Sequence, residues 1–182
     1  MIVKKIIALI YITLCTIIHV QSQSNVSSVF NRLLIFNAQN EMMVVKIENR
    51  DFWVTPGLYQ TQDRTMKNGL DSIANTYGIQ LKNIKLNGTF LLLRDINGKR
   101  STSLRNVFTA ELKSITKKIP TGIEKVEWLS PKEAFNKITF PHINEMIKQV
   151  TSDPKKVWGG TLLQYRENDQ WKTRILEPFY VL

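Results

Sequence analysis

The residue types that most often carry out chemistry are scarce in this chain. It has 182 residues, with one cysteine, Cys15, and two histidines, His19 and His142. A single cysteine excludes an internal disulfide framework and any zinc site built on cysteines. A Ser–His–Asp triad would have to use His142, which stands at the predicted start of a helix. We therefore expect His142 to be a surface or capping residue without a catalytic role.

The first 22 residues have the pattern of a secretory signal peptide. Lys4 and Lys5 precede an apolar run over residues 6–20, and Val20 and Ser22 suit the −3 and −1 positions of a cleavage site. We predict cleavage after Ser22 and export to the periplasm or the medium. The alternative is an uncleaved anchor helix, for which the apolar run is short.

Cleavage would change what the remaining chain can do. It removes Cys15, so no cysteine nucleophile remains, and it removes His19. Because two lysines leave and no acidic residue does, the formal charge falls from +10 to +8. The mature chain would then begin with a flexible polar lead at residues 23–30 and would have no membrane span.

Hydrophobic periodicity and turn residues predict one α/β domain. Ser130, Pro131 and Glu133 form a helix-start pattern, and Gly78 is expected to end an earlier helix. The first two strands are expected to close a hairpin, and the strand at 84–94 is expected to bend near Asn87. Strands are predicted at 32–36, 42–47, 52–55, 84–94, 103–112, 123–129, 158–165 and 171–179, and helices at 65–77, from 131 onward and at 141–150.

One part of this order resembles the Nudix hydrolase family. The run Phe52-Trp53-Val54-Thr55-Pro56-Gly57 is similar to the aromatic strand and Pro-Gly turn of that family, and residues 127–134 resemble its late strand and following helix. Counting from Gly57, the spacing of the family's sequence box closes without a gap on Gly78 and Ile79. The resemblance covers roughly residues 32–150. It implies a Nudix-like α/β/α sandwich with a mixed sheet over residues 31–152.

The chemistry of the box positions differs from that of the family. Asp63 stands at the first Glu position and Asp71 at the Arg position, while Ser72, Asn75 and Thr76 stand at the other Glu positions. Helix positions 72, 75 and 76 share one face, where carboxylates could converge on a divalent cation. Neutral oxygens there offer little attraction to Mg²⁺, which prefers anionic ligands. If Asp63 and Asp71 lie close together, one of their pKa values should rise.

Acidic residues downstream are the remaining candidates for a metal site. Their simplest interpretation is solvated charge on strand ends. Mg²⁺ or Mn²⁺ would be a cofactor only if the chain is an active hydrolase, and otherwise we expect none. The downstream acids are Glu111, Glu124, Glu127 and Glu133, and the catalytic candidates of an active enzyme would be Asp63, Asp71, Glu111 and Glu127.

The basic residues suggest either a solvated surface or an anionic ligand. The chain lacks an arginine-rich helix with paired stacking aromatics, so we do not expect it to bind nucleic acid. Should an anionic ligand bind, the pocket is expected between the 65–77 helix and the strands from 84 to 112. The residues expected to contact it are Arg64, Lys67, Arg94 and Arg105.

Residues 153–182 lie beyond the Nudix-like core and are rich in aromatic side chains. We predict a β-hairpin that packs on the domain, because an isolated hairpin would be marginally stable. The alternative is an exposed edge that pairs with a second copy to form a homodimer, or with another protein.

Together these observations predict an exported Nudix-fold protein that has lost the metal-binding glutamates and serves as a non-catalytic binding or interaction module. Its partner would be an anionic small molecule or an envelope protein. Two alternatives remain. One is a metal-dependent hydrolase of a nucleoside-diphosphate-linked or other phosphorylated small molecule, with a rearranged site. The other is an assembly protein of the cell envelope.

Overall fold

The computed structural model of this chain describes residues 28–116 and 118–182. The predicted signal peptide at 1–22, residues 23–27 of the predicted lead, and Lys117 lie outside the described residues. Ser28–Phe30 were predicted to belong to the lead, and this prediction is wrong. They begin the first strand, because they pair with residues 103–105 of a neighbouring strand.

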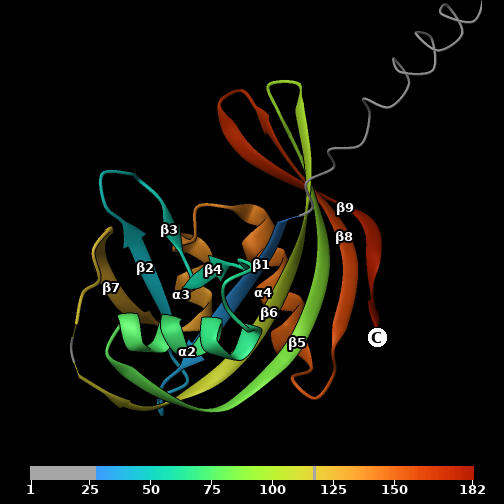
Figure 1. Cartoon of the computed structure of the whole chain (residues 1–182). Coiled ribbons are helices and arrows are strands. Elements are labelled where there is room, and N and C mark those ends of the chain that lie inside the picture. Colours follow the sequence, from blue (N-terminus) through green and yellow to red (C-terminus); the bar gives the residue numbers. More distant parts are fainter. Residues whose placement is uncertain (1–27, 117) are drawn as a thin grey trace, which may run out of the picture.

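The described residues form nine strands and three helices (Figure 1). The strands are β1 (Ser28–Phe36), β2 (Met42–Ile47), β3 (Trp53–Val54), β4 (Gly57–Tyr59), β5 (Ile79–Ile96), β6 (Lys99–Ile115), β7 (Ile123–Leu129), β8 (Trp158–Glu167) and β9 (Gln170–Val181). The helices are α2 (Met66–Thr76), α3 (Pro131–Lys137) and α4 (Pro141–Ser152). None of the helices in residues 28–116 and 118–182 has both the length and the apolar character needed to cross a membrane.

All nine strands belong to one sheet, and the sheet is mixed, as predicted. The short strand β4 was not predicted. Its main path runs β3-β2-β1-β6-β5-β8-β9, while β4 pairs with β1 and β7 pairs with β2. The β1–β6 and β5–β8 pairs are parallel, and the other pairs are antiparallel. The parallel β1–β6 pair lies at the centre of the molecule and brings the residues of β1 beside the long β5–β6 hairpin.

The prediction that β1 and β2 form a hairpin ladder holds only at its turn. In the register of these two strands, Phe36 and Met42 alone face each other. Beyond this pair β1 runs along β6 and β4, while β2 pairs with β7 and β3. The two strands separate because each forms a longer ladder with another strand, β1 with β6 and β2 with β7.

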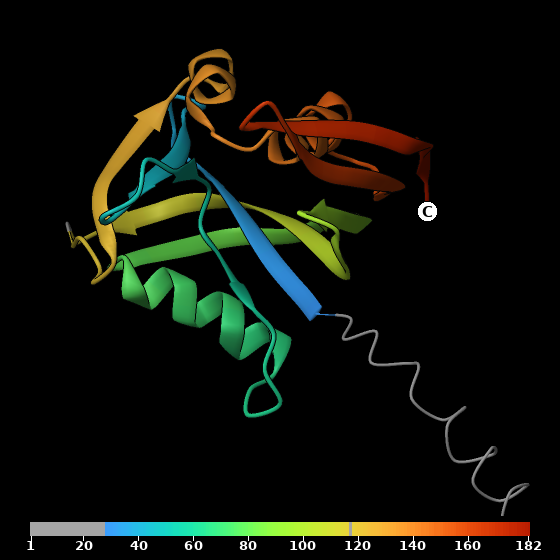
Figure 2. The ribbon, with the colours of Figure 1, turned by 90° about the horizontal axis from the view of Figure 1, so that it is seen from above.

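Alternating side chains of β1 divide the interior into two cores, one on each face of the sheet. Leu33 and Ile35 pack in the core that includes Ile73 of α2, whereas Leu34 packs in the core that includes Met146 of α4. Figure 2 shows α2 on one side of β1, β5 and β6, and α4 on the other side. The predicted α/β/α sandwich is therefore confirmed.

Helix α2 begins and ends where the sequence predicts. The Thr65 hydroxyl accepts a hydrogen bond from the backbone N–H of Asn68 (3.2 Å), which caps the first turn. Gly78 follows the helix with a φ of +64°, and a Cβ atom there would lie 2.4 Å from the carbonyl oxygen of Thr116. Only glycine fits this position, because it needs both a left-handed backbone and a close backbone approach.

The β5–β6 hairpin is longer than predicted but turns and bends at the predicted places. Asn97 and Gly98 form its turn, with φ values of +53° and +75°. The register of the ladder shifts between Leu86 and Gly88, where the bend was expected. The hairpin extends from α2 to the far end of the sheet, so the residues near its turn lie away from α2.

The C-terminal hairpin extends the sheet. Strand β8 pairs with β5 in parallel, and the ring of Phe179 on β9 meets that of Phe90 on β5 with centroids 5.5 Å apart. Strand β9 forms the edge, as Figure 1 shows. Four of its large apolar side chains are exposed, Ile175, Leu176, Tyr180 and Val181, and so is Leu182, which follows the strand.

Candidate functional site

The box positions of α2 line an open hollow on the outer face of the helix. It has a volume of about 510 Å³ and includes Lys118 from the segment after β6. Ser72, Asn75 and Thr76 are brought together here, and the Thr76 hydroxyl donates a hydrogen bond to the Ser72 carbonyl (2.7 Å). The hollow is lined by Asn68, Asp71, Ser72, Asn75, Thr76 and Lys118. It therefore contains one carboxylate and one ammonium group.

The two aspartates of the box are each paired with a cation. Asp71 accepts an ion-pair contact from Lys67 at 2.6 Å, one turn earlier on α2. Asp63 lies 3.5 Å from Arg64. Hydrogen bonding from the Thr61 side chain, with smaller contributions that include Arg64, lowers the pKa of Asp63. The raised pKa that mutual repulsion would produce is therefore not found at Asp63.

The downstream glutamates do not approach this hollow. Glu111 on β6 is held by Asn83 (3.0 Å) and Lys82 (3.3 Å). Along β6, Phe108 and Ala110 belong to the core under α2, so the alternation of the strand directs Glu111 to the opposite face. Glu111 therefore cannot join Asp71 in one site.

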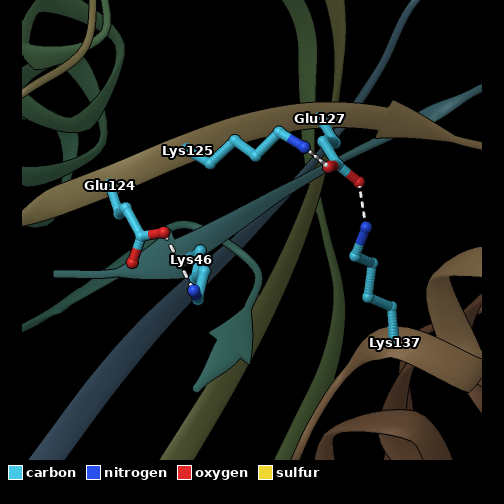
Figure 3. A network of polar contacts seen from close by, with 5 residues as sticks. All are labelled: Lys46, Glu124, Lys125, Glu127 and Lys137. Atoms are coloured by element: carbon cyan, nitrogen blue, oxygen red, sulfur yellow. Dashed lines mark hydrogen bonds and ion pairs between the residues drawn. The ribbon is translucent and has the colours of Figure 1, made fainter. Parts of the chain in front are cut away.

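Glu127 also faces away from α2. It accepts contacts from Lys125 (2.6 Å) and Lys137, and these two lysines lower its pKa (Figure 3). The ammonium group of Lys137 also lies 4.1 Å from the centroid of the Trp53 ring. Glu127 thus links β7 to α3, and its oxygens are already used by two cations.

These residues do not fit a divalent metal ion. Among residues 28–116 and 118–182, no group of three or more His, Cys, Asp or Glu side chains is arranged to hold one. The four carboxylates of the predicted alternative site lie on both faces of the sheet, and each has a lysine or arginine partner. We derive no catalytic step through a metal from them.

The predicted hollow between α2 and the β5–β6 hairpin exists, but it is mostly apolar. It has a volume of about 480 Å³ and is lined by Met66, Lys67, Leu70, Asp71, Ile84, Leu86 and Phe108. Its lysine is the one that pairs with Asp71. The four cations predicted to contact an anion do not gather here, because Arg94 and Arg105 lie on the other face of the sheet.

That other face holds a group of arginines near the first turn of α4, two of them buried and Arg94 half-buried. We call it the arginine cluster: Arg32 on β1, Arg94 on β5 and Arg105 on β6. Arg32 and Arg105 are 4% and 6% exposed. Arg32 donates from Nη1 to the carbonyl oxygen (3.2 Å) and hydroxyl (2.5 Å) of Thr55. Arg105 donates from Nε to the Ser103 hydroxyl (2.9 Å). The Nε atoms of Arg32 and Arg94 are buried and have no partner within the described chain.

The arginine cluster has no carboxylate to balance it. Among the described residues, the arginine ion pairs are those of Arg64, Arg100 and Arg166. Residues 1–27 and 117 contain no Asp or Glu that could supply another. Burial and the neighbouring Arg105 lower the pKa of Arg32 to about 9, so it remains charged at neutral pH. Three cationic side chains thus lie near one another, and two of them, Arg32 and Arg105, are buried.

Two aromatic rings line the cluster. The guanidinium carbon of Arg105 lies 4.9 Å from the ring centroid of Phe30 and 5.7 Å from that of Tyr59. These two rings meet edge to face. Gly57 on β4 permits this arrangement, because a Cβ atom there would lie 2.6 Å from the Phe30 ring and 2.8 Å from the Asn31 carbonyl oxygen. Such contacts partly offset the loss of hydration of the arginines.

His142 lies in the same region, and its burial contradicts the prediction made for it. It was expected at the surface, but it is 5% exposed, in the first turn of α4. Burial, with Arg32, Arg105 and Arg94 nearby, holds the pKa of His142 well below its ordinary range. Arg32 and His142 were missed as site residues. The signal for Arg32 was a charged residue directly before the apolar run Leu33–Ile35, where a buried strand position is expected.

Comparison with known proteins identifies the fold. No protein-family model and no curated protein matches the sequence. Among solved structures, the MutT protein from Bacillus halodurans is 19% identical, with 83% of this chain and 99% of that chain covered and a TM-score of 0.68. A Nudix hydrolase from Nitrosomonas europaea is 18% identical, with 69% and 89% covered and a TM-score of 0.57.

A third solved structure agrees with these two. The dihydroneopterin triphosphate pyrophosphohydrolase of E. coli is 12% identical, with 69% of this chain and 96% of that chain covered and a TM-score of 0.51. This chain therefore has the fold of the Nudix hydrolases, and the resemblance read from the box spacing is confirmed at the level of the fold. At these identities, the comparison establishes the fold alone.

Proposed function

We propose that this chain is an exported, non-catalytic binding module of Nudix fold, and that its ligand is a small anionic molecule held by the arginine cluster. The observation that carries the proposal is the burial of Arg32 and Arg105, together with Arg94, without any carboxylate partner. Buried cations are costly unless a counter-charge accompanies them. An anionic ligand would supply that charge.

The character of the ligand is supported by the fold comparison. Dihydroneopterin triphosphate, in the name of the E. coli protein, is a phosphorylated small molecule. Guanidinium groups hold phosphate oxygens well, since their planar N–H donors can form paired hydrogen bonds with them. We therefore propose a phosphorylated or similarly charged ligand for this chain.

The non-catalytic assignment rests on the hollow of α2. Positions 72, 75 and 76 carry neutral oxygens, and Lys118 adds a positive charge beside them. A divalent cation in this hollow would meet one carboxylate, Asp71, that already pairs with Lys67. Hydrolysis by a rearranged site using Asp63, Asp71, Glu111 and Glu127 has less support, because these groups lie on both faces of the sheet.

Calorimetric titration with inorganic pyrophosphate, in the presence of EDTA, tests the binding proposal. We expect saturable binding without metal, weakened at least about tenfold in Arg105→Gln because a charge-assisted hydrogen bond is lost. Arg100→Gln is the matched control, since Arg100 is exposed on the same strand and pairs with Asp95. Equal binding by both variants would contradict the proposed site.

An activity assay tests the non-catalytic assignment. The protein is incubated with ADP-ribose and either Mg²⁺ or Mn²⁺, and the release of nucleotide products is measured. We expect no metal-dependent hydrolysis above background. Hydrolysis that is abolished in Asp63→Asn or Asp71→Asn would instead support the rearranged hydrolase.

Fractionation of cells that express the full chain tests the proposed export. If the chain is exported and cleaved, a shorter protein should be found outside the cytoplasm.

A second candidate function rests on the exposed apolar side chains of β9. Ile175, Leu176 and Val181 are each at least 42% exposed on the edge strand, where a second copy or an envelope protein could bind. Deleting the hairpin would uncover Phe90 and perturb the core, so a point change is the better test. If Leu176→Lys changes the oligomeric state of the full chain in analytical ultracentrifugation, an interface at β9 is favoured.

A further inference from the structure

His142 has an unsatisfied buried group and lies beside the arginine cluster. Its Nδ1 atom is buried and has no hydrogen-bond partner among the described residues. The side chain is 5% exposed and is held against Phe140, with ring centroids 5.9 Å apart. A buried polar atom of this kind normally has a partner. The Nδ1 atom lacks a hydrogen-bond partner, and the three arginines beside it lack a counter-charge. A single bound acceptor could therefore serve both His142 and the arginines.

The charged groups that act on His142 from the sheet are all positive. Arg32 of β1, Arg94 of β5 and Arg105 of β6 act on the ring from the sheet. In register with Arg94, β8 and β9 contribute Gln164 and Thr173, whose side chains are uncharged.

Two further titratable groups lie near these residues. On α4 itself, Glu145 is held by Lys148 at 3.1 Å. Tyr59 of β4 lies against Arg105. Because the Glu145 carboxylate already pairs with Lys148, a proton on His142 would face the three arginines, and the ring stays neutral in the absence of a ligand.

We propose that His142 is a fourth contact for the ligand of the arginine cluster, and that it takes up one proton when a dianionic oxyanion, such as a phosphate ester or sulfate group, binds there. This inference rests on the proposed function. The proton comes from solvent and is added to Nδ1, which then donates a hydrogen bond to a ligand oxygen. No covalent bond forms or breaks.

Anion binding and protonation of His142 are coupled because the anion changes the sign of the charge nearest the ring. A dianion among the arginines turns a field that opposes an imidazolium into one that favours it, because the nearest charge is then negative. The buried Thr173 hydroxyl, which also lacks a partner within the described residues, offers a further donor on this face. A carboxylate ligand carries less charge and fewer oxygens, so it would satisfy fewer of these donors.

Proton uptake makes the affinity depend on pH in a defined direction. Where the free protein holds His142 neutral and the complex holds it charged, each unit of decreasing pH should tighten binding by up to about tenfold. Sulfate is a suitable probe because it remains a dianion throughout the pH range in which imidazole titrates. Any pH dependence of sulfate binding then originates in the protein.

The experiment is titration of the full chain with sodium sulfate at several pH values from 5.5 to 8, in pairs of buffers that differ in ionisation enthalpy. We expect net uptake of about one proton per sulfate near pH 7. In His142→Gln, sulfate should still bind at pH 8, but with no proton uptake and a flat pH profile. Methyl phosphate, compared at pH 8, distinguishes a phosphate-ester site from a general oxyanion site by its relative affinity.

The outcomes separate this inference from the proposed function. One outcome is that the wild type binds sulfate, Arg105→Gln does not, and His142→Gln has the same pH profile of sulfate affinity as the wild type. The proposed contact with His142 is then wrong, while the proposed anion site is supported. If sulfate and pyrophosphate both fail to bind, the proposed function fails as well. Should His142→Gln not fold, the imidazole resonances of the wild-type protein, titrated with and without sulfate, report the same coupling: an unchanged His142 titration overturns it.

Discussion

Phe30 and Arg105 face each other on two parallel strands, with the guanidinium carbon 4.9 Å from the ring centroid. The guanidinium of Arg32, two residues along β1, lies 5.2 Å from the same ring. One aromatic ring is therefore shared by two buried cations. The ring stabilises them in part, but it cannot replace a counter-ion.

The first prediction is that Arg105→Met stabilises the protein when no phosphate or sulfate is present. The substitution removes a buried, unpaired charge and keeps an apolar side chain of similar length against Phe30. We expect the free energy of unfolding in a buffer free of phosphate and sulfate to rise by about 1–2 kcal/mol. Denaturation by urea at a constant chloride concentration measures it.

The same variant should respond differently to ligand. Sulfate should raise the melting temperature of the wild-type protein and leave that of Arg105→Met nearly unchanged, because ligand binding stabilises the folded state only where the site is intact. A variant that is less stable than the wild type in buffer free of phosphate and sulfate would show that Arg105 is a structural residue that does not require a counter-charge.

The second prediction concerns stability below neutral pH. His142 binds a proton more readily in the unfolded chain than in the fold, since its pKa is lowered on folding. Between about pH 6.5 and 5 the unfolded state therefore holds the extra proton, and the free energy of unfolding should fall by up to about 1.4 kcal/mol per pH unit. Above this window the contribution of His142 is constant.

Urea unfolding at pH 7.5, 6.0 and 5.0 checks this slope. His142→Gln should show a shallower decline over the same window, and saturating sulfate should also reduce it in the wild type. An identical decline in the variant would assign the pH dependence to other groups.

The sequence predicts the local structure of this chain well, because local rules determine it. The ends of α2 follow from Thr65 and Gly78, and the start of α3 follows from Ser130 and Glu133, which form the predicted capping box. The strands β2 and β7 occupy the predicted residues. The spacing of the box also predicted the fold, since it is set by a turn, a helix and a helix end.

The arginine cluster could not be predicted in the same way. It depends on the parallel pairing of β1 with β6, which brings Phe30 beside Arg105 across 75 residues of chain, and on α4 placing His142 over that face. Alternation within one strand does not show which strand will be its neighbour. The predicted groove therefore combined Arg94 and Arg105 with Lys67, although the sheet separates them.

The third prediction tests why Gly78 ends α2. Gly78 and Gly98 both have a positive φ, but a Cβ atom at Gly98 would meet nothing within 4 Å. Alanine at position 98 should therefore cost only the backbone strain, about 1 kcal/mol, whereas alanine at position 78 should cost about 3 kcal/mol because it also clashes with Thr116. Equal losses in denaturation experiments would contradict the close approach.

The fourth prediction compares two glutamates of β7, Glu124 and Glu127, which Figure 3 shows at separate places along the strand. Glu127 is 16% exposed and contacts two lysines, whereas Glu124 is 47% exposed and contacts Lys46 alone. Glu127→Gln should lower the free energy of unfolding by about 1 kcal/mol, and Glu124→Gln should change it less. Thermal denaturation at pH 7 provides the comparison.

The pH dependence of the Glu127 contacts has the opposite sign to that of His142. Lys125 and Lys137 lower the pKa of Glu127 in the fold, so its contribution is present above the ordinary pKa of glutamate and is lost as the pH falls through the lowered value. The difference between wild type and Glu127→Gln should therefore shrink below about pH 4.5. A difference that persists there would indicate that packing, and not the ion pairs, accounts for the loss.

The last prediction is that carboxylates at the box positions would be enough to create a metal site on α2. Positions 72, 75 and 76 already lie together in one hollow, so Ser72→Glu, Asn75→Glu and Thr76→Glu combined would place three carboxylates on one helix face. We expect the triple variant to bind Mn²⁺ saturably in electron paramagnetic resonance titrations and the wild type to show no such binding. A single Asn75→Glu variant should bind far more weakly, because one carboxylate cannot replace the lost hydration of the ion. Adding Lys118→Ala to the triple variant should tighten binding further, since an ammonium group then no longer opposes the cation. If the wild-type chain binds Mn²⁺ as tightly as the triple variant, its own aspartates and glutamates suffice, and the non-catalytic assignment must be withdrawn.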